Sequence, residues 1–533
     1  MAGWNFPDVW EVVATTLPDS PALVHGCRRV AWAEFDDRAD GLAQVFLDAG
    51  LTRHDKVAQY LFNCPEYMES VYAAFKAALV PVNTNYRYGA EELTYLWTNA
   101  DAAAVVFHGC FTELVDGLLP RLPGVRLWVW VDDGSGPCPD WATPYDVATK
   151  AASGRVVPPW GRSGDDPFFL YTGGTTGYPK GVMWRQDDLF VNLTAASGLG
   201  EAPDLDAVRA QVTAPGLTQL AAAPLMHGTG ALTAMAALAS GGCVITLPSR
   251  RFDPVELLDT VERERVGSIV LVGDAFAKPV LEALDAHPRR WDLSSLVAIG
   301  SSGTMWSEQT KQGLLGHHPG LMLIDSLGSS EALGAAQSVS GGDGVAGTAR
   351  FQLGPMTRVL TDDGRDVEPG SGEIGRLVVG GRLPLGYYKD EERTRATFVT
   401  VDGQRYAMAG DWATVAADGT VTLLGRGSGC INTGGEKVFP EEVEEVLKVQ
   451  PGVADAVVVG VPDERLGEAV VAVVQPRDDA ELDEAALIAS VKGRLASYKA
   501  PKRVIVAPVE RGPNGKVDYP AVQAAAAASR PGG

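Results

Sequence analysis

The segment Tyr171-Thr172-Gly173-Gly174-Thr175-Thr176-Gly177-Tyr178-Pro179-Lys180-Gly181 decides the fold class, and it directly follows an apolar run typical of a strand. Glycine permits positive φ and close backbone approach, so successive N–H groups can surround an anion while threonine hydroxyls and a lysine complete the cradle. The segment is not the Walker pattern, because Pro179 stands where the last glycine would be. It predicts a phosphate-binding loop, and the alternative is an ordinary glycine-rich surface turn.

Helical and extended patterns alternate on both sides of this loop. Residues 36–49 and 66–78 have helical periodicity, and each is followed by a short apolar run, as are two further helical segments within residues 254–299. This alternation predicts a layered α/β body that extends to about residue 350. The most apolar stretch, residues 231–247, is too short and too interrupted by glycine for a membrane span, and it predicts a buried helix followed by a buried strand.

The character of the chain changes twice after this body. Residues 354–425 contain short alternating runs between Asp-Gly turns, which predict antiparallel β structure. A glycine-rich run then precedes about 100 residues with the pattern of a small α+β unit, and the Ala- and Gly-rich tail 521–533 is expected to fray. We therefore expect an α/β fold with a large multi-subdomain body, residues 1–425, and a small mobile α+β C-terminal lid, residues 426–533, with a hinge near 426–429.

Composition excludes several classes of protein. The chain has 533 residues, of which 46% are hydrophobic and 21% charged, so it is neither disordered nor a small disulfide scaffold. Its net charge of −22 argues against nucleic acid as a partner. The six cysteines have no metal-site or disulfide spacing, and the N-terminal sequence has no signal pattern, so we expect a reduced, cytoplasmic protein without a transmembrane segment.

Further short motifs follow the phosphate loop in a fixed order: Pro224-Leu225-Met226-His227-Gly228, Ser302-Gly303-Thr304, Ser326-Leu327-Gly328-Ser329-Ser330-Glu331, Gly410-Asp411, Gly425-Arg426, Gly434-Gly435-Glu436 and Gly515-Lys516. With these motifs the chain resembles, over almost its whole length, the adenylate-forming superfamily of acyl-CoA synthetases, luciferases and peptide-synthetase adenylation domains. The resemblance implies that a carboxylate attacks the α-phosphate of ATP to give acyl-AMP and pyrophosphate, and that the thiol of CoA then displaces AMP.

The resemblance also implies roles for individual residues. The residues implied to bind the nucleotide are Thr172, Gly173, Gly174, Thr175, Thr176, Gly177, Lys180, Ser302, Gly303, Thr304, Asp325, Ser326, Leu327, Gly328, Ser330, Asp411 and Arg426. Those implied to act in catalysis are Lys516, Glu331, Thr175 and His227, with Thr175 and Glu331 holding Mg²⁺. CoA is implied to contact Gly434, Gly435 and Glu436, and the acyl pocket is implied to include His227, Gly300, Trp306 and Leu327.

Each of these residues also has an ordinary structural reading. A surface carboxylate is the alternative for Glu331 and Asp411, a solvated loop tip for Lys516, and a satisfied histidine at a helix start for His227. The small residues near Gly300 are explained equally by a close backbone approach to the nucleotide.

Three positions depart from the usual superfamily pattern: Gly429 replaces a hinge aspartate, Ser330 a threonine, and Leu327 an aromatic residue that flanks adenine. With the sequence after the phosphate loop, they resemble the bacterial fatty-acyl and steroid side-chain CoA ligases. We therefore expect an acid:CoA ligase that uses ATP, Mg²⁺ and CoA on a bulky apolar carboxylic acid, such as a steroid or terpenoid acid, and that forms a homodimer. The alternatives are an enzyme that only forms the thioester from preformed acyl-adenylate and a non-catalytic nucleotide-binding homologue.

Overall fold

The computed structural model describes residues 3–172, 179–304, 306–426, 431–433, 436–463, 466–477, 480–495, 497–511 and 517–529. The chain divides into two compact units, the first formed by Met1–Ala346 with Gly380–Ala407 and the second by Gly347–Val379 with Met408–Gly533. The predicted α/β class is confirmed. The boundary at residue 425 and the hinge near 426–429 stay predictions, and residues 427–430 lie outside the described ranges.

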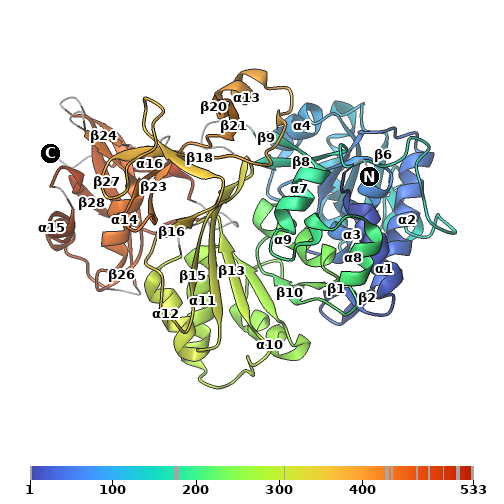
Figure 1. Cartoon of the computed structure of the whole chain (residues 1–533), viewed down its shortest axis with the longest axis horizontal. Helices are drawn as coiled ribbons and strands as arrows, with labels where there is room; N and C mark the ends of the chain where they lie inside the picture. The colour runs from blue at the N-terminus through green and yellow to red at the C-terminus, as the bar shows by residue number, and fades with distance from the viewer. Residues whose placement is uncertain are drawn as a thin grey trace. The chain divides into compact units, whose positions relative to one another are not determined.

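The first unit contains a largely parallel sheet that carries several of the predicted motifs (Figure 1). Its strands follow the order β2 (Arg28–Ala31), β1 (Pro21–His25), β11 (Cys243–Thr246), β10 (Thr218–Ala221), β12 (Ser268–Leu271), β13 (Ala298–Ser302), β14 (Met322–Ser329) and β15 (Ala332–Ser340). Neighbours from β1 to β14 are parallel, and β2 and β15 are antiparallel to the strands beside them. Its parallel strands β1 and β10 to β14 contribute Val, Ile and Leu side chains to one buried apolar core, as parallel strands require.

An eight-stranded second sheet lies in the same unit. Its order is β19 (Gly386–Tyr387), β9 (Lys180–Arg185), β8 (Pro167–Thr172), β4 (Val80–Asn83), β3 (Lys56–Tyr60), β5 (Ala102–His108), β6 (Leu127–Val131) and β7 (Thr143–Pro144). Strands β8 to β7 are parallel, whereas β9 and β19 are antiparallel additions at one edge. A short hairpin, β20 (Phe398–Val401) with β21 (Gln404–Ala407), completes the strands of this unit.

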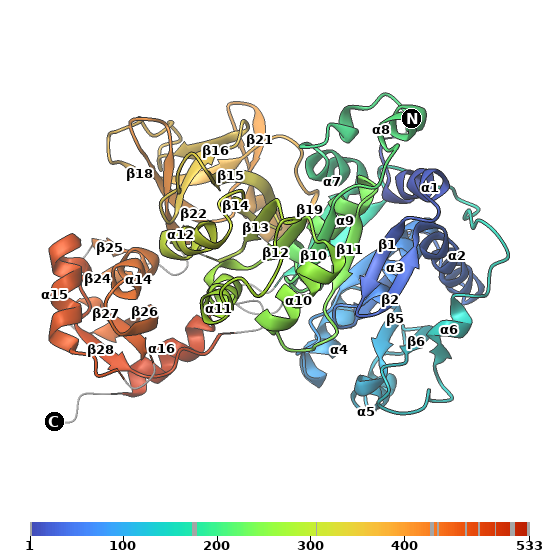
Figure 2. The same ribbon diagram turned by 90° about the horizontal axis from the view of Figure 1, so that it is seen from below.

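Helices connect and cover these sheets (Figure 2). They are α1 (Phe6–Thr16), α2 (Trp32–Asp48), α3 (Pro65–Lys76), α4 (Ala90–Asn99), α5 (Thr112–Asp116), α6 (Tyr145–Ala148), α7 (Gln186–Leu193), α8 (Leu205–Gln211), α9 (Gly228–Ala239), α10 (Pro254–Glu264), α11 (Gly273–Ala286), α12 (Glu308–His317) and α13 (Glu391–Thr397). Helix α10 illustrates the local signals, because the Asp253 side chain caps the amides of Val255 and Glu256 while Pro254 occupies the first turn. The apolar stretch 231–247 forms the end of α9 and then β11, as predicted.

The second unit combines two groups of strands. The antiparallel group contains β16 (Arg350–Leu353), β17 (Thr357–Leu360), β18 (Ile374–Val379), β22 (Asp411–Val415) and β23 (Val421–Arg426). The other is a five-stranded sheet of β24 (Ile431–Thr433), β25 (Glu436–Val438), β26 (Val453–Asp463), β27 (Gly467–Pro476) and β28 (Arg503–Val506), with helices α14 (Pro440–Lys448), α15 (Glu484–Arg494) and α16 (Tyr519–Ala528). Both the antiparallel portion and the small α+β pattern were expected from the sequence.

The prediction that the tail frays from residue 521 was wrong. Residues Tyr519–Ala528 form α16, whose start is capped by the Asp518 side chain. Alanine has the highest helix propensity, and Ala526 is buried with Val522 packed against the same core as β26. Packing of one helix face therefore orders a segment whose composition alone suggested a loose end.

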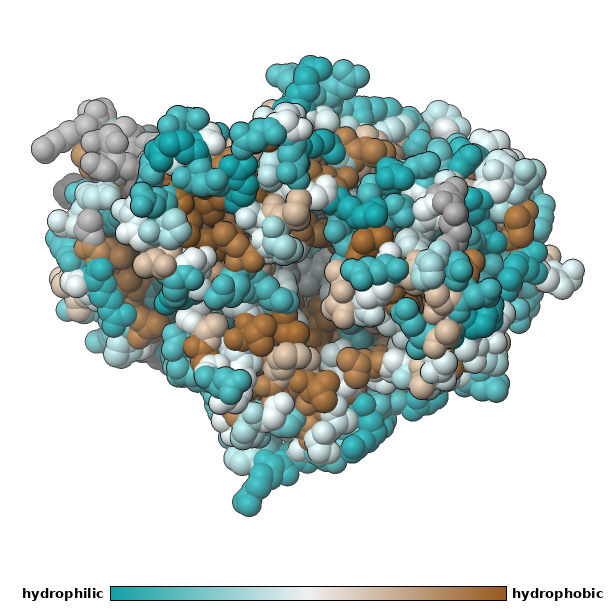
Figure 3. All heavy atoms as spheres, in the orientation of Figure 1, coloured by the Kyte–Doolittle hydropathy of each residue, from teal (hydrophilic) through white to brown (hydrophobic). Residues whose placement is uncertain are grey.

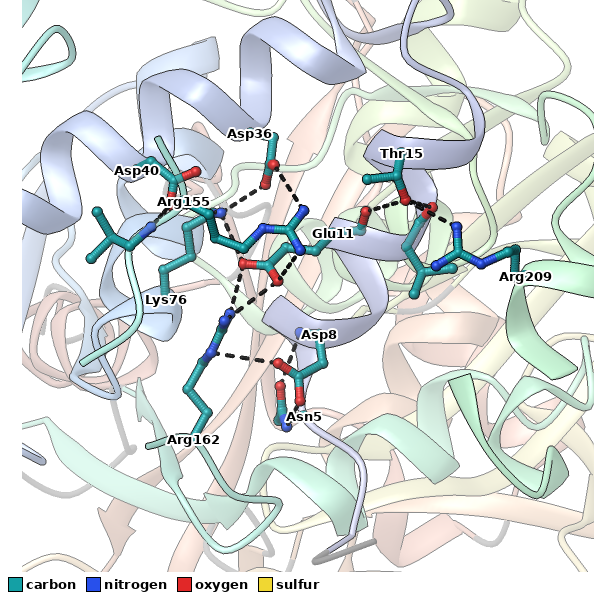
Figure 4. Close-up of polar contacts among 12 residues, drawn as sticks. Asn5, Asp8, Glu11, Thr15, Asp36, Asp40, Lys76, Arg155, Arg162 and Arg209 are labelled. Atoms are coloured by element: carbon teal, nitrogen blue, oxygen red, sulfur yellow. Dashed lines mark hydrogen bonds and ion pairs between the residues drawn. The ribbon is translucent and has the colours of Figure 1, made fainter. Parts of the chain in front are cut away.

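A buried cluster of charges ties together the N-terminal helices of the first unit (Figure 4). The Lys76 ammonium lies 2.8 Å from Asp36, 2.9 Å from Asp40 and 3.0 Å from Glu11. Arg162 binds Glu11 as well, at 2.8 Å. Burial opposes the charge on Lys76, but the three carboxylates outweigh it and raise the pKa of the ammonium group.

Apolar side chains are mostly inside, and single exceptions such as Leu217, Val297 and Val339 remain exposed. On the face drawn in Figure 3, brown apolar areas are separated by hydrophilic ones. Within the described ranges, none of the helices combines the length and the apolar character needed to cross a membrane.

Candidate active site

The phosphate-loop segment begins and ends in a β-hairpin. Strands β8 and β9 are antiparallel, and Thr172 pairs directly with Lys180. The residues between them that were predicted to bind phosphate, Gly173, Gly174, Thr175, Thr176 and Gly177, lie outside the described residues, so their roles stay predictions. Gly181 is required by packing, because an added Cβ would lie 2.8 Å from the Tyr171 ring. The described flanks thus bring the ends of the segment together, with Lys180 at its exit.

Glu331 lies in the turn between β14 and β15, close to the strand that carries Lys180. The Tyr387 hydroxyl donates a hydrogen bond to Glu331 Oε1 at 2.7 Å, and the Lys180 ammonium lies 5.4 Å from the centre of the Tyr387 ring. The indole N–H of Trp184 donates to the carbonyl of Ser330 at 3.0 Å. Strands β9 and β19 therefore hold the Ser330–Glu331 turn, and they bring two of the predicted site residues, Lys180 and Glu331, to one place.

The strand predicted to flank adenine is β14, which contains Asp325, Ser326, Leu327 and Gly328. It is parallel to β13, and Ser302 at the end of β13 pairs with Ser326, as expected where carboxyl ends of parallel strands form a ligand site. After Ser302 the chain turns at Gly303, whose φ of +96° favours glycine. The Thr304 hydroxyl is buried and has no hydrogen-bond partner among the residues that the structure describes. An orphaned donor at this position is consistent with a ligand that supplies the acceptor.

The Asp325 carboxylate has an ion-pair partner within the protein. Its carboxylate lies 3.1 Å from the Lys311 ammonium, and both side chains are buried. Burial raises the pKa of Asp325 to about 6, although Lys311 opposes the shift. The predicted contact of Asp325 with the nucleotide stays a prediction.

His227 precedes α9 and serves as its N-cap residue, without a side-chain hydrogen bond to the helix. The Asn83 amide donates to the carbonyls of Tyr171, at 2.8 Å, and Met226, at 2.7 Å, and so joins the end of β8 to the residue before His227. An added Cβ on Gly303 would lie 3.7 Å from Thr229, so the turn after β13 approaches the same helix start. The His227 motif, the β8 end and the β13 end are therefore neighbours.

Other residues of the predicted acyl pocket differ in burial. Gly300 and Leu327 are partly exposed, on β13 and β14. Trp306 has no exposed surface and belongs to the core that includes Leu314 and Leu323. Its place in an acyl pocket stays a prediction.

The second unit carries the remaining predicted residues. Asp411, at the start of β22, is directly opposite Arg426, at the end of β23. Glu436 pairs with Thr433 across β24 and β25, whereas Gly434 and Gly435 lie outside the described residues. Lys516 also lies outside the described residues. In the sequence it falls between Arg511 and Val517, which form a β-bridge with each other. The two residues predicted to lie at the ribose are thus on adjacent strands, and their roles, the predicted CoA contacts and the role of Lys516 all stay predictions.

Three structural partners of the site were missed in the sequence: Asn83, Trp184 and Tyr387. Each makes its contact with a residue far away in the chain, 56 residues in the case of Tyr387 and Glu331. Asn83 directly ends a predicted strand, which is where site residues of parallel sheets occur, and this signal could have found it. Tyr387 follows a glycine in an otherwise unremarkable loop sequence, so nothing local identifies it.

The donors at Glu331 fit a magnesium ion. Mg²⁺ prefers hard oxygen ligands and is usually held by one or two carboxylates together with substrate phosphates. Glu331 supplies a carboxylate that is 9% exposed, and its recorded hydrogen bond comes from a neutral phenol rather than from a cation. The Tyr387 hydroxyl therefore orients the carboxylate, and no salt bridge recorded among the described residues compensates its negative charge.

Residues 10–388 match the family described as AMP-binding enzyme, and residues 442–516 match the AMP-binding enzyme C-terminal domain. The 3-oxocholest-4-en-26-oate--CoA ligase of Rhodococcus rhodochrous is 39% identical over 528 residues, which are 97% of this chain and 94% of that protein. The medium-chain acyl-CoA ligase Mig of Mycobacterium avium is 38% identical over 538 residues, 97% of each chain.

Solved structures of this fold also match the chain over nearly its whole length. The crystal structure of ATP-bound MatB from Rhodopseudomonas palustris has a TM-score of 0.80 and 25% sequence identity, and the match covers 98% of this chain and 99% of that one. The family models match parts of both units, and the match to the Rhodococcus ligase covers 97% of the chain. The chain belongs to the AMP-binding enzyme family, the adenylate-forming superfamily that its motifs resemble.

Proposed function

We propose that this protein is an AMP-forming acid:CoA ligase that uses ATP, Mg²⁺ and CoA. The observation that carries the proposal is that Glu331 and Lys180, a carboxylate suited to a metal ion and a cation suited to phosphate, both contact Tyr387. An enzyme that only used preformed acyl-adenylate would meet a single phosphate, and it would have no use for this pair. The relatives named as CoA ligases over 97% of the chain support the same activity.

In the first half-reaction a carboxylate oxygen of the acid attacks the α-phosphorus of ATP, and the bond to the pyrophosphate oxygen breaks. Lys180, with Thr175 and Thr176, holds the β- and γ-phosphates, and Lys516 meets the carboxylate and α-phosphate oxygens as negative charge accumulates. When bound, Mg²⁺ neutralises phosphate charge, and Glu331 with Thr175 would hold it. Asp411 accepts hydrogen bonds from the ribose hydroxyls.

In the second half-reaction the CoA sulfur attacks the acyl carbonyl carbon, the thiol proton is lost, and AMP leaves with the electron pair of the mixed anhydride bond. Gly434, Gly435 and Glu436 line the path of the pantetheine arm, where two glycines leave room for a narrow chain. His227 lies beside the acyl carboxylate, near the strands that hold the nucleotide.

The substrate that we propose is a bulky, largely apolar acid such as a steroid side-chain or long-chain acid. The relatives named for 3-oxocholest-4-en-26-oate and for medium-chain acyl groups support this class. The β13 end, Gly300 to Gly303, offers only small side chains, which leave space for a wide ring system. Each buried CH₂ contributes about 0.8 kcal/mol to binding, so a bulky apolar acid gains most from such a pocket.

A panel of acetate, octanoate, palmitate and a polycyclic steroid acid tests this function. We expect CoA-dependent AMP formation with the highest kcat/KM for a bulky acid, and acid-dependent pyrophosphate exchange without CoA. Lys516→Ala should abolish the exchange while thioester formation from supplied acyl-adenylate continues. Preference for acetate would refute the substrate class, and ATP binding without pyrophosphate release for any acid would refute the activity.

The same proposal includes a homodimer located in the cytoplasm, without nucleic-acid partners. The net charge of −22 supports the last point, because phosphate backbones bind basic surfaces.

A further inference from the structure

Tyr387 is held rigidly by its surroundings. It lies on β19, where it pairs with Val182 of β9. Its backbone N–H donates to the Thr394 hydroxyl at 2.9 Å, and the preceding Gly386 has a φ of +151° and packs so closely against Thr394 that a Cβ would lie 2.4 Å from it. The ring is 5% exposed. These contacts fix the position of the phenol before any ligand binds.

The phenol acts on one oxygen of Glu331 only. Its hydroxyl donates to Oε1 at 2.7 Å, a usual length for an O–H···O hydrogen bond. A phenol ordinarily keeps its proton at neutral pH, so the Tyr387 hydroxyl is available there as a donor. The other oxygen is left for a ligand from outside the described residues.

The same tyrosine also contacts the phosphate-binding cation. Lys180 lies 5.4 Å from the ring centre, within the range of a cation–π interaction. On the opposite side of the turn, Trp184 holds the Ser330 carbonyl. One side chain thus touches both the carboxylate and the ammonium group that must meet the ATP phosphates.

We infer that Tyr387 is a positioning residue of the magnesium site: its hydroxyl orients the Glu331 carboxylate and thereby sets the Mg²⁺ concentration at which ATP is used. The inference rests on the proposed role of Glu331. Partners that orient metal-binding side chains change metal affinity or activity by about 10- to 100-fold when they are removed. Because Tyr387 contacts Glu331 and not the metal, the lower end of this range, about 10-fold, is expected.

Tyr387→Phe removes the hydroxyl and keeps the ring beside Lys180. We expect the half-saturating Mg²⁺ concentration for pyrophosphate exchange to rise about 10-fold, with activity restored by excess Mg²⁺ and with little change in KM for the acid. Mn²⁺, titrated into the ATP complex and followed by electron paramagnetic resonance, should bind about 10-fold more weakly, which measures the site without turnover. Thermal unfolding checks that the variant is folded.

Tyr388→Phe is the matched control, because the Tyr388 hydroxyl donates to Asp101 at 2.7 Å and has no recorded contact with Glu331. Its metal titration should match that of the wild type. Unchanged Mg²⁺ and Mn²⁺ titrations in Tyr387→Phe, or equal shifts in both tyrosine variants, would overturn the inference. Glu331→Gln distinguishes failure of the proposed metal site from failure of the inference about Tyr387. If Glu331→Gln also leaves the metal titrations unchanged, the proposed metal role of Glu331 fails. If Glu331→Gln shifts the titrations and Tyr387→Phe does not, only the role of Tyr387 fails.

Discussion

Two of the groups of buried charges in the first unit are built on opposite principles. Around Lys76, three carboxylates meet three cations, Lys76 itself, Arg155 and Arg162, and Figure 4 shows these side chains pointing toward one another. At Glu331 the recorded partner is a neutral phenol, and Lys180 lies over the ring of that phenol. Charges that are paired inside the protein stabilise the fold. A carboxylate that has a hydrogen-bond donor but no recorded counter-charge is instead suited to bind a cation from solution.

This difference predicts how substitutions divide between stability and activity. Removing one member of a balanced buried group leaves uncompensated charges and destabilises the fold. Removing a carboxylate from a binding site relieves an unbalanced charge, so the fold loses little and activity loses much.

Lys76→Met should destabilise the first unit by about 3–5 kcal/mol, because Asp36, Asp40 and Glu11 would lose the ammonium group that all three contact. Urea unfolding followed by tryptophan fluorescence measures the loss, since Trp10 and Trp32 are buried in the same helices. The control is Arg395→Met, which removes a 74% exposed side chain and should change stability by less than about 0.5 kcal/mol. A loss of ATP use by Lys76→Met at full stability would contradict the assignment of this cluster to the fold.

Asp325 gives an intermediate test, because it lies on β14, the strand predicted to flank adenine, and forms a buried pair with Lys311 of α12. Its pKa is about 6 in the fold against 3.8 in an ordinary carboxyl, so the folded protein binds the proton more tightly than the unfolded chain does. The contribution of Asp325 to stability should therefore fall as pH rises from about 4 to about 6, by about 3 kcal/mol in total, and should not change further above that range.

The measurement for Asp325 compares the wild type with the double variant Asp325→Asn, Lys311→Met. The difference between their unfolding free energies should vary with pH over this range and be flat above it. A difference that is constant across the whole range would show that the carboxyl does not titrate there.

Local patterns in the sequence predicted the secondary structure near the site. The contacts between side chains of the site depend instead on which distant segments pair. The segment Pro254–Glu264 is a helix with the expected bounds, because its capping residues are adjacent in sequence. The phosphate segment could be recognised for the same reason. The role of Tyr387 could not, since it depends on which strands become neighbours. Trp306 carried no signal for whether its ring would face a pocket or the core.

Glu331→Gln should have the smallest effect on stability and the clearest effect on activity. The amide is nearly isosteric and can still accept the Tyr387 hydrogen bond through its oxygen, so the free energy of unfolding should change by less than about 1 kcal/mol. The amide carries no charge for Mg²⁺, and the half-saturating metal concentration for pyrophosphate exchange should rise by about 100-fold. Thioester formation from supplied acyl-adenylate needs no triphosphate site and should continue. If Glu331→Gln instead destabilised the protein as strongly as Lys76→Met, the Glu331 carboxylate would belong with the balanced charges of the fold, and the contrast between the two groups would not hold.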